Sequence, residues 1–374
     1  MSPVNFSELV AGNNKKIAIV ELNSAQSLNA LSLAMIELLL KQLLTWQSDD
    51  EIAMVILQGA GDKAFCAGGD VVSLYHALKS EKSNNESTIS DLAIAENLAQ
   101  EFFSKEYQLD QLIHEFTKPI LVWGDGYIMG GGIGLFAGAS HRVVTEKSLL
   151  AMPEITIGLY PDVGASWFLN KVPNNAGLFL GLTGAIFNAL DALDIGLANI
   201  AIGSRFKEHL LQSLSEVVWQ GEQENFTLLD KALEHLIEHS SADFKVITSN
   251  VEQHRDIIDQ LTEFDNGLDI YNAILTLDSD NDWLQRAQAK LKKGSPLSAM
   301  IIYRQLMTSK NFTLAECFSS ELNLSLRCCQ HQEFSEGVRA LLVDKDKMPQ
   351  WAYDDIKEIP TELIDWFFTP IAHL

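Results

Sequence analysis

The chain has 374 residues, of which 47% are hydrophobic and 21% charged, the composition of a globular protein with a large core. Its formal net charge is −23, from 50 acidic against 27 basic residues, which argues against nucleic acid or an anionic membrane as a main partner. A small anionic ligand remains compatible with this charge, because a pocket can be locally positive on an acidic protein.

The first half of the chain alternates strand and helix patterns. Apolar strand signals are followed by helical ones, and Ser32 is placed to cap a helix that runs to about Trp46. Strands are expected at residues 17–22, 52–57, 120–123 and 141–145, a second helix at 91–116, and a loop at 80–90. This alternation predicts a mainly parallel sheet with helices packed outside it.

From about residue 205 the strand signals thin out and acidic, Leu-rich helical patterns take over, as at residues 230–239 and 256–264. We therefore expect an α/β core over residues 1–205 and a mainly helical region over residues 206–374. The most membrane-like run, residues 119–139, holds seven glycines and Asp125, so a strand, a turn and a helix explain it better than a bilayer span.

The cysteines favour a reduced setting, because none forms a CxxC pair and the adjacent Cys328 and Cys329 seldom bridge each other. Residues 1–12 show neither a secretory signal nor an Arg-rich transit pattern. From these two observations we expect a cytoplasmic protein.

Two glycine stretches stand out, Gly68-Gly69 and residues 130–132, each after an apolar strand-like run. Glycine pairs are commonly tight turns, and that interpretation stays open. Glycine also lets a backbone N–H approach a ligand closely, and two such groups converging on one point would form an oxyanion hole.

Two acids, Glu154 and Asp162, follow the second glycine stretch and have mostly apolar neighbours in the sequence. A single acid after proline is usually solvated, but apolar neighbours on both sides favour partial burial. Burial raises a carboxyl pKa and prepares the group for attack or proton transfer, so two such acids could divide those roles. Glu106, judged from helical spacing alone, is expected on a helix surface.

Several chemistries are not indicated. The sequence has no GxSxG elbow, no P-loop and no complete dinucleotide-binding fingerprint. It also lacks HExxH and paired Cys/His ligands, so we predict no metal site.

Several segments resemble the crotonase (enoyl-CoA hydratase/isomerase) superfamily, and most closely its 3-hydroxyisobutyryl-CoA hydrolase branch. They are residues 29–31 (NAL), 64–70 (AFCAGGD), 129–135 (MGGGIGL), 151–154 (AMPE), 157–164 (IGLYPDVG), 336–347 (EGVRALLVDKDK) and 349–351 (PQW). The resemblance implies an α/β fold of ββα superhelical repeats, forming a sheet core with outer helices, plus a helical C-terminal extension.

The resemblance also implies roles for individual residues. It makes the N–H groups of Gly69 and Gly131 the oxyanion hole, Glu154 the catalytic glutamate and Asp162 a second catalytic acid. It further implies that the substrate is bound by these groups together with Glu106, Ala67 and Gly68.

One departure separates the branches. Hydratases of this superfamily carry a second glutamate two residues after the glycine triplet, where this chain has Gly134. The chain therefore lacks one of the two glutamates that hydration uses, whereas Asp162 supplies an acid at another position. The favoured reaction is therefore hydrolysis of 3-hydroxyisobutyryl-CoA to 3-hydroxyisobutyrate and CoA, a step of valine breakdown.

Two alternatives stay open: an enoyl-CoA hydratase or isomerase on the same fold, and a non-catalytic acyl-CoA-binding protein. In each case the expected partner is a small acyl-CoA, without nucleic acid or membrane. No cofactor is expected beyond the CoA carried by the substrate, and a homo-oligomer is left open.

Overall fold

The computed structural model describes residues 2–82 and 89–372, and its contacts divide the chain into two compact units, each built from three segments. Unit 1 comprises Met1–Gly69, Gln108–Leu150 and Phe187–Gln253. Unit 2 comprises Asp70–Tyr107, Ala151–Ile186 and His254–Leu374. Both units draw on residues before and after position 205, so the compact units interleave across the boundary expected there.

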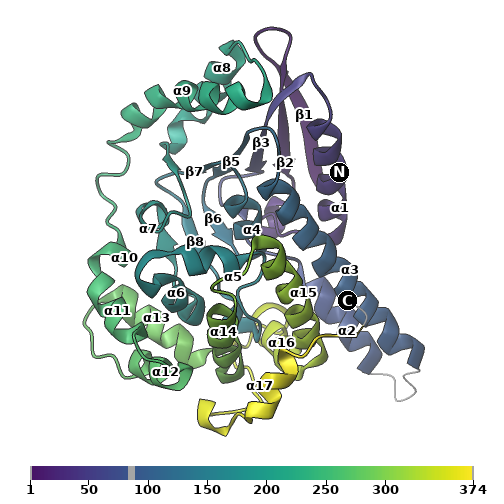
Figure 1. Ribbon diagram of the computed structural model, residues 1–374, viewed down its shortest axis with the longest axis vertical. Helices are drawn as coiled ribbons and strands as arrows, with labels where there is room; N and C mark the ends of the chain where they lie inside the picture. The colour runs from purple at the N-terminus through teal and green to yellow at the C-terminus, as the bar shows by residue number, and fades with distance from the viewer. Residues whose placement is uncertain (1, 83–88, 373–374) are drawn as a thin grey trace. The chain divides into compact units, whose positions relative to one another are not determined.

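A six-stranded sheet forms the centre of unit 1, in the order β1-β2-β3-β5-β7-β10 (Figure 1). Its strands are β1 (Val4–Val10), β2 (Lys16–Leu22), β3 (Ile52–Gly59), β5 (Ile120–Gly124), β7 (His141–Val144) and β10 (Ile200–Ala201). Only the β1–β2 pair is antiparallel, and every pair from β2 to β10 is parallel. This confirms the mainly parallel sheet.

A second sheet has four very short strands, in the order β4-β6-β8-β9. They are β4 (Ala64–Cys66), β6 (Tyr127–Met129), β8 (Leu149–Ala151) and β9 (Phe187–Asn188). Strands of two or three residues are too short to display an alternating pattern, which is why the sequence did not predict them.

The helix expected after Ser32 is α1 (Leu33–Gln47). The Ser32 side chain accepts a hydrogen bond from the N–H of Met35 at 3.3 Å, and α1 buries Ile36, Leu39 and Leu43 against the core. The other helices confined to unit 1 are α4 (Gly131–Ala137), α7 (Ala189–Asp194), α8 (Lys207–Glu216), α9 (Glu222–Ser240) and α10 (Asn250–Gln253).

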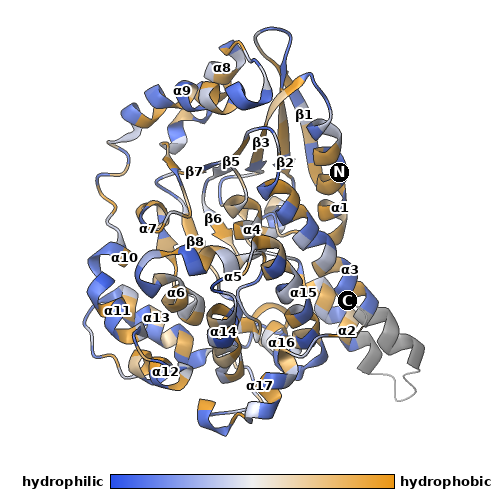
Figure 2. Ribbon diagram, in the orientation of Figure 1, coloured by the Kyte–Doolittle hydropathy of each residue, from blue (hydrophilic) through white to orange (hydrophobic). Residues whose placement is uncertain are grey.

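Helices α8 and α9 complete the core of unit 1, although they lie beyond residue 205. Leu210 and Leu214 of α8 and Leu229 and Leu233 of α9 share one buried cluster with sheet residues such as Ile56. Figure 2 shows α9 as a mixture of hydrophilic and hydrophobic stretches, as expected of a helix with one buried face.

Unit 2 is mainly helical. Its α-helices are α2 (Val71–Lys82), α5 (Ala165–Phe168), α6 (Ala176–Thr183), α11 (Arg255–Thr262), α12 (Gly267–Leu275), α13 (Asp282–Lys293), α14 (Pro296–Thr308), α15 (Leu314–Gln330), α16 (Gln332–Val338) and α17 (Thr361–Phe367). A 3₁₀ turn, η2 (Glu154–Ile157), and a π-helical turn, η6 (Arg339–Val343), are important for the site. Helix α3 (Ile89–His114) passes from unit 2 into unit 1.

The structure corrects the expected loop at residues 80–90 and confirms the strand and helix expected within residues 119–139. Residues 80–82 belong to α2 and residues 89–90 to α3, so the expected loop at 80–90 is wrong at both ends, and its remainder lies outside the described residues. Within the part of the chain that the structure describes, no helix is both long and apolar enough to cross a membrane. Residues 119–139 form β5, β6 and α4 instead.

Candidate functional site

The two glycine stretches lie side by side in unit 1, because the strands that precede them are neighbours. Strands β4 and β6 pair in parallel, with Cys66 opposite Ile128, and the N–H of Tyr127 donates to the carbonyl of Lys63 at 2.9 Å. Parallel neighbours end at the same edge of a sheet. The loop with Gly68-Gly69 and the turn before α4 therefore emerge together.

Two of the glycines have a structural reason, one a close approach and the other its backbone conformation. A Cβ on Gly132 would lie 2.3 Å from the carbonyl oxygen of Cys66, so no other residue fits without a shift. Gly68 has φ +112°, and a Cβ there would lie 4.0 Å from the amide nitrogen of Gly131. Gly68 therefore lies in a turn that favours glycine, and the approach of an N–H to a ligand stays a prediction.

The first glycine loop is braced by the segment around Asn29. The Asn29 side-chain amide donates to the carbonyls of Ala60 and Ala64, each at 3.0 Å, and the N–H of Leu31 donates to the carbonyl of Gly68 at 2.8 Å. Asn29 is fully buried with φ +59°. This gives a structural reason for the NAL segment, to which the sequence assigned no role.

The amides of Gly69 and Gly131 stay the candidate oxyanion donors. Gly131 is the first residue of α4, where an N–H has no acceptor within its own helix. Gly69 follows the positive-φ turn at Gly68 and bridges to Leu31. Ala67, also expected at the substrate, is half-buried in the same loop.

The three carboxylic acids expected at the site are all buried, and all belong to unit 2. Glu154 and Asp162 are each 5% exposed, as their apolar flanks predicted, and Glu106 is 2% exposed. The surface position expected for Glu106 is therefore wrong. Helix α3 also buries Phe103 and Tyr107, so its buried face is wider than the single stripe that spacing suggests.

Burial raises the pKa of all three acids, and the charge of Asp162 adds to the rise for Glu154 and Glu106. For Glu154 the pKa is well above its ordinary value, first because of burial and then because of the charge of Asp162. Burial followed by Asp162 likewise raises the pKa of Glu106, and burial raises the pKa of Asp162 to about 6. A low-dielectric site with like charges favours the protonated forms.

Two oxygens of this set have unused hydrogen-bonding capacity. Oε2 of Glu154 and Oε1 of Glu106 are buried and find no hydrogen-bond partner among the described residues. The positive charge of Lys290 counteracts part of the rise in the pKa of Glu154. The ammonium of Lys290 donates to the carbonyl of Gly184 at 2.6 Å, which holds it in place.

A buried hydrogen-bond network fixes Asp162. The hydroxyl of Tyr107 donates to Oδ2 of Asp162 at 2.7 Å and lies 2.7 Å from the hydroxyl of Ser325. Tyr160 lies 2.9 Å from the same Ser325 hydroxyl and donates to the carbonyl of Glu321 at 2.7 Å. Sequence reasoning missed Tyr107 and Ser325, which are 218 residues apart and come together only in the fold.

Glu321 of α15 anchors the loop that follows Asp162. Its fully buried carboxylate accepts from the N–H of Gly164 at 2.7 Å and from the N–H and hydroxyl of Ser166 at 2.9 and 2.5 Å. Burial raises the pKa of Glu321 to about 8. In the sequence it looks like any acid on an amphipathic helix, so no local signal could have identified it.

The C-terminal EGVRALLVDKDK segment packs directly on η2, which carries Glu154. A Cβ on Gly337 would lie 2.3 Å from the carbonyl carbon of Ile157, and a Cβ on Gly158 would lie 2.3 Å from the carbonyl oxygen of Glu333. Helix α16 and η2 are therefore in backbone contact. The segment's glycine is required by this close approach.

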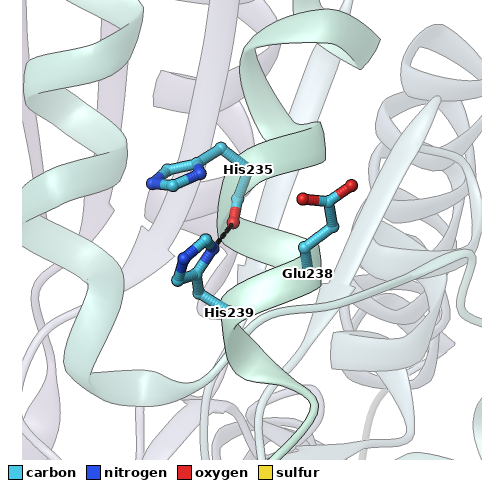
Figure 3. Close-up of side chains that lie close together, drawn as sticks. All are labelled: His235, Glu238 and His239. Atoms are coloured by element: carbon cyan, nitrogen blue, oxygen red, sulfur yellow. Dashed lines mark hydrogen bonds between the residues drawn. The ribbon is translucent and has the colours of Figure 1, made fainter.

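One cluster of metal-ligating side chains is found in the part of the chain that the structure describes, and it contains none of the expected site residues. His235, Glu238 and His239 lie on one exposed turn of α9, with ligand atoms within 4.8 Å of one another (Figure 3). One ring nitrogen of His239 lies 2.8 Å from the carbonyl oxygen of His235. The expectation that the reaction needs no metal or cofactor stays a prediction.

Comparisons with known proteins identify one family. The family model described as enoyl-CoA hydratase/isomerase matches residues 17–368. Proteins named 3-hydroxyisobutyryl-CoA hydrolase, mitochondrial, are 34% identical in Danio rerio, over 99% of this chain and 92% of that protein, and 35% identical in Homo sapiens, over 95% and 86%.

Two solved structures have the same fold over nearly the whole chain. An enoyl-CoA hydratase from Rhodobacter sphaeroides 2.4.1 superposes with a TM-score of 0.82 at 27% identity, covering 99% of this chain and 98% of that one. A carnitinyl-CoA dehydratase from Mycobacterium thermoresistibile gives 0.83 at 26% identity, covering 100% and 98%.

The expected cytoplasmic location is wrong on this comparison, because the names of the relatives place them in the mitochondrion. None of the four cysteines, all within the described residues, forms a disulfide, but reduced thiols do not separate one reducing compartment from another. The family model and the relatives each cover nearly the whole chain. The chain therefore belongs to the enoyl-CoA hydratase/isomerase family.

Proposed function

We propose that this chain hydrolyses acyl-CoA thioesters, with 3-hydroxyisobutyryl-CoA as its substrate and a place in valine breakdown. One observation carries the proposal: Glu154 and Asp162 are both buried with raised pKa values, while position 134 is glycine. The names of the relatives support the substrate. The net charge of −23 supports an account without nucleic acid.

The proposed reaction begins with polarisation of the thioester. Its oxygen accepts hydrogen bonds from the amides of Gly69 and Gly131, and losing one such donor would cost about 3 kcal/mol of transition-state stabilisation. The backbone supplies these donors, and glycine at both positions leaves the approach to them unobstructed by a side chain. Gly68 and Ala67 hold the loop that presents the first donor.

Glu154 then attacks the thioester carbon in its ionised form. The C–S bond breaks, CoA leaves as a thiolate that takes up a proton, and a mixed anhydride remains on Glu154. Water hydrolyses the anhydride, which releases the hydroxy acid and restores the carboxylate. A Glu154 that activates water directly would give the same products and the same dependence on its ionised form.

Asp162 and Glu106 bind the substrate in this account. Tyr107 holds Oδ2 of Asp162 at 2.7 Å, which fixes the carboxylate so that it can orient the 3-hydroxyl group. Oε1 of Glu106 lacks a partner among the residues described and offers a second acceptor. A substrate without the 3-hydroxyl would lose these contacts.

The test is a comparison of substrates on the purified full-length chain. Thiol release from 3-hydroxyisobutyryl-CoA and from isobutyryl-CoA is followed together with loss of the conjugated double bond of crotonyl-CoA. We expect rapid thiol release from the 3-hydroxy substrate and slower release from isobutyryl-CoA. Rapid hydration of crotonyl-CoA without thiol release would instead establish a hydratase, and tight binding without either reaction would establish a non-catalytic binder.

A further inference from the structure

A cluster of metal-ligating side chains lies on α9 in unit 1, and the proposed reaction does not use it. His235, Glu238 and His239 are all exposed, and one ligand atom from each lies within 4.8 Å of the other two (Figure 3). The proposed catalytic acids Glu154 and Asp162 belong to unit 2. The cluster therefore needs a role outside that reaction.

Helical geometry brings the three side chains together. Residues three and four apart on a helix are neighbours, so His235 is adjacent to both Glu238 and His239. The ring centroids of the two histidines lie 4.0 Å apart. Residues 235–239 read HLIEH, the H-x-x-E-H order of one class of zinc enzymes and the reverse of the HExxH order that the chain lacks. In both orders the two histidines lie on one helical face and can hold a single metal ion.

A hydrogen bond sets the tautomer of His239. Its Nδ1 lies 2.8 Å from the carbonyl oxygen of His235. Because a carbonyl oxygen only accepts, Nδ1 carries the proton, and in the neutral ring Nε2 keeps its lone pair. Histidine ligands of metals commonly donate their other ring N–H to a carbonyl, which orients the ring and raises its basicity. The hydrogen bonding of His239 is therefore already that of a metal ligand.

The turn that carries the cluster is held in place by the core beneath it. Leu236, between the ligating residues, is 3% exposed and belongs to the buried cluster of unit 1. The hydroxyl of the buried Ser240 donates to the carbonyl of Leu236 at 2.6 Å and accepts from the N–H of Gly203 at 2.8 Å. A fixed backbone lowers the entropic cost of assembling the ligands around an ion.

The local charge favours a cation. The cluster lies at the C-terminal end of α9, where carbonyl groups without a helical partner and the helix dipole create a negative potential. Arg205 donates to the carbonyl of His239 at 3.2 Å, but its guanidinium is paired with Asp243 at 3.0 Å. Lys231, one turn before the cluster, is exposed, so solvent screens its charge.

We propose that His235, Glu238 and His239 bind a divalent transition metal of the Zn²⁺ class. Imidazole nitrogens suit Zn²⁺, Cu²⁺ and Ni²⁺, whereas Mg²⁺ and Ca²⁺ prefer all-oxygen ligands. Three protein ligands leave one tetrahedral position of Zn²⁺ to a water molecule. Because all three side chains are exposed, we assign to the site a metal that stabilises the end of α9, and no hydrolytic step.

Zinc binding to the purified full-length chain, without an affinity tag, tests the site. Calorimetry with ZnCl₂ compares the wild type, His235→Gln/His239→Gln and the control His209→Gln, which changes an exposed histidine of α8 outside the cluster. We expect one Zn²⁺ per wild-type chain and binding at least about 10-fold weaker in the double variant, because losing even an indirect partner of a metal ligand costs about 10–100-fold. The control should bind like the wild type.

Thermal melting separates the loss of the metal from a loss of folding. Without metal, the double variant should melt at nearly the wild-type temperature, because the exchanged side chains are exposed. Zn²⁺ should raise the melting temperature of the wild type and of His209→Gln but not that of the double variant, since a ligand of the folded chain stabilises it. The same concentration of Mg²⁺ should raise none of them.

Two results would overturn the site. One is a wild type that binds no Zn²⁺, and the other is a double variant that binds Zn²⁺ as tightly as the wild type. Glu238→Gln tests the third ligand in the same calorimetry and should bind more weakly than the wild type. Unchanged binding by Glu238→Gln would overturn the three-ligand assignment.

Discussion

Tyr107→Phe should lower the free energy of unfolding more at pH 8 than at pH 5. The substitution keeps the ring and removes the hydroxyl that donates to Asp162 at 2.7 Å. Burial raises the pKa of Asp162 to about 6, and the bond from Tyr107 partly opposes that rise because it stabilises the ionised form. Without the hydroxyl, the pKa of Asp162 rises further.

The sign of the pH dependence follows from that raised pKa. Below the ordinary pKa of 3.8 the carboxyl is protonated in both folded and unfolded chains and costs nothing. As the pH rises through about 6 the buried carboxylate must ionise, and its full penalty is present above that value. At pH 8 the variant loses a hydrogen bond to a charged group, about 1.5–3 kcal/mol, and at pH 5 a neutral one, about 0.5–1.5 kcal/mol.

Urea denaturation of the wild type and variant at the two pH values measures this difference. Tyr160→Phe is the matched control, because the Tyr160 hydroxyl contacts the Ser325 hydroxyl and the Glu321 carbonyl but is not bonded to Asp162. Its loss of free energy of unfolding should be nearly the same at both pH values. An equal loss at pH 5 and pH 8 for Tyr107→Phe would refute the assigned role of the hydroxyl.

Two further predictions concern the acids and the glycine turn. The acid limb of the kcat/KM profile should lie above pH 4.5, because Glu154 reacts in its ionised form and its pKa is raised. A pH–rate series should show this limb at lower pH in Asp162→Asn, which removes a repelling charge. It should show the limb at higher pH in Lys290→Met, which removes an attracting charge. Shifts in the same direction would contradict the electrostatics. Gly132→Ala should lower the melting temperature, because the new Cβ would lie 2.3 Å from the carbonyl oxygen of Cys66. Overpacking of this kind costs about 1–3 kcal/mol of folding free energy. An unchanged melting temperature would show that the turn can open.

The long elements could be predicted from the sequence because their patterns are local. Strands β3 and β5 are largely apolar, β2 and β7 contain shorter apolar runs, and α1 has both a cap and a buried stripe. The two- and three-residue strands that bring the glycine stretches together carry no such pattern. The sequence also did not predict that each unit is built from three separate segments, because this division depends on contacts between residues far apart in the sequence.

The candidate site could be predicted only where the signal was local in the sequence. Apolar flanks indicated the burial of Glu154 and Asp162, and helical spacing gave the wrong answer for Glu106. Tyr107 and Glu321 support Asp162 and its loop through partners 55 and 155–157 residues away, and no local pattern identifies such pairs. Whether the chain forms a homo-oligomer stays a prediction from the resemblance.

The most direct test of the central claim is the rate of thiol release from 3-hydroxyisobutyryl-CoA by Glu154→Gln, with folding confirmed by circular dichroism. The substitution keeps the shape of the side chain and removes the carboxylate that attacks the thioester or activates water. The account predicts a loss in kcat of at least about 10²-fold. Turnover near that of the wild type would contradict it.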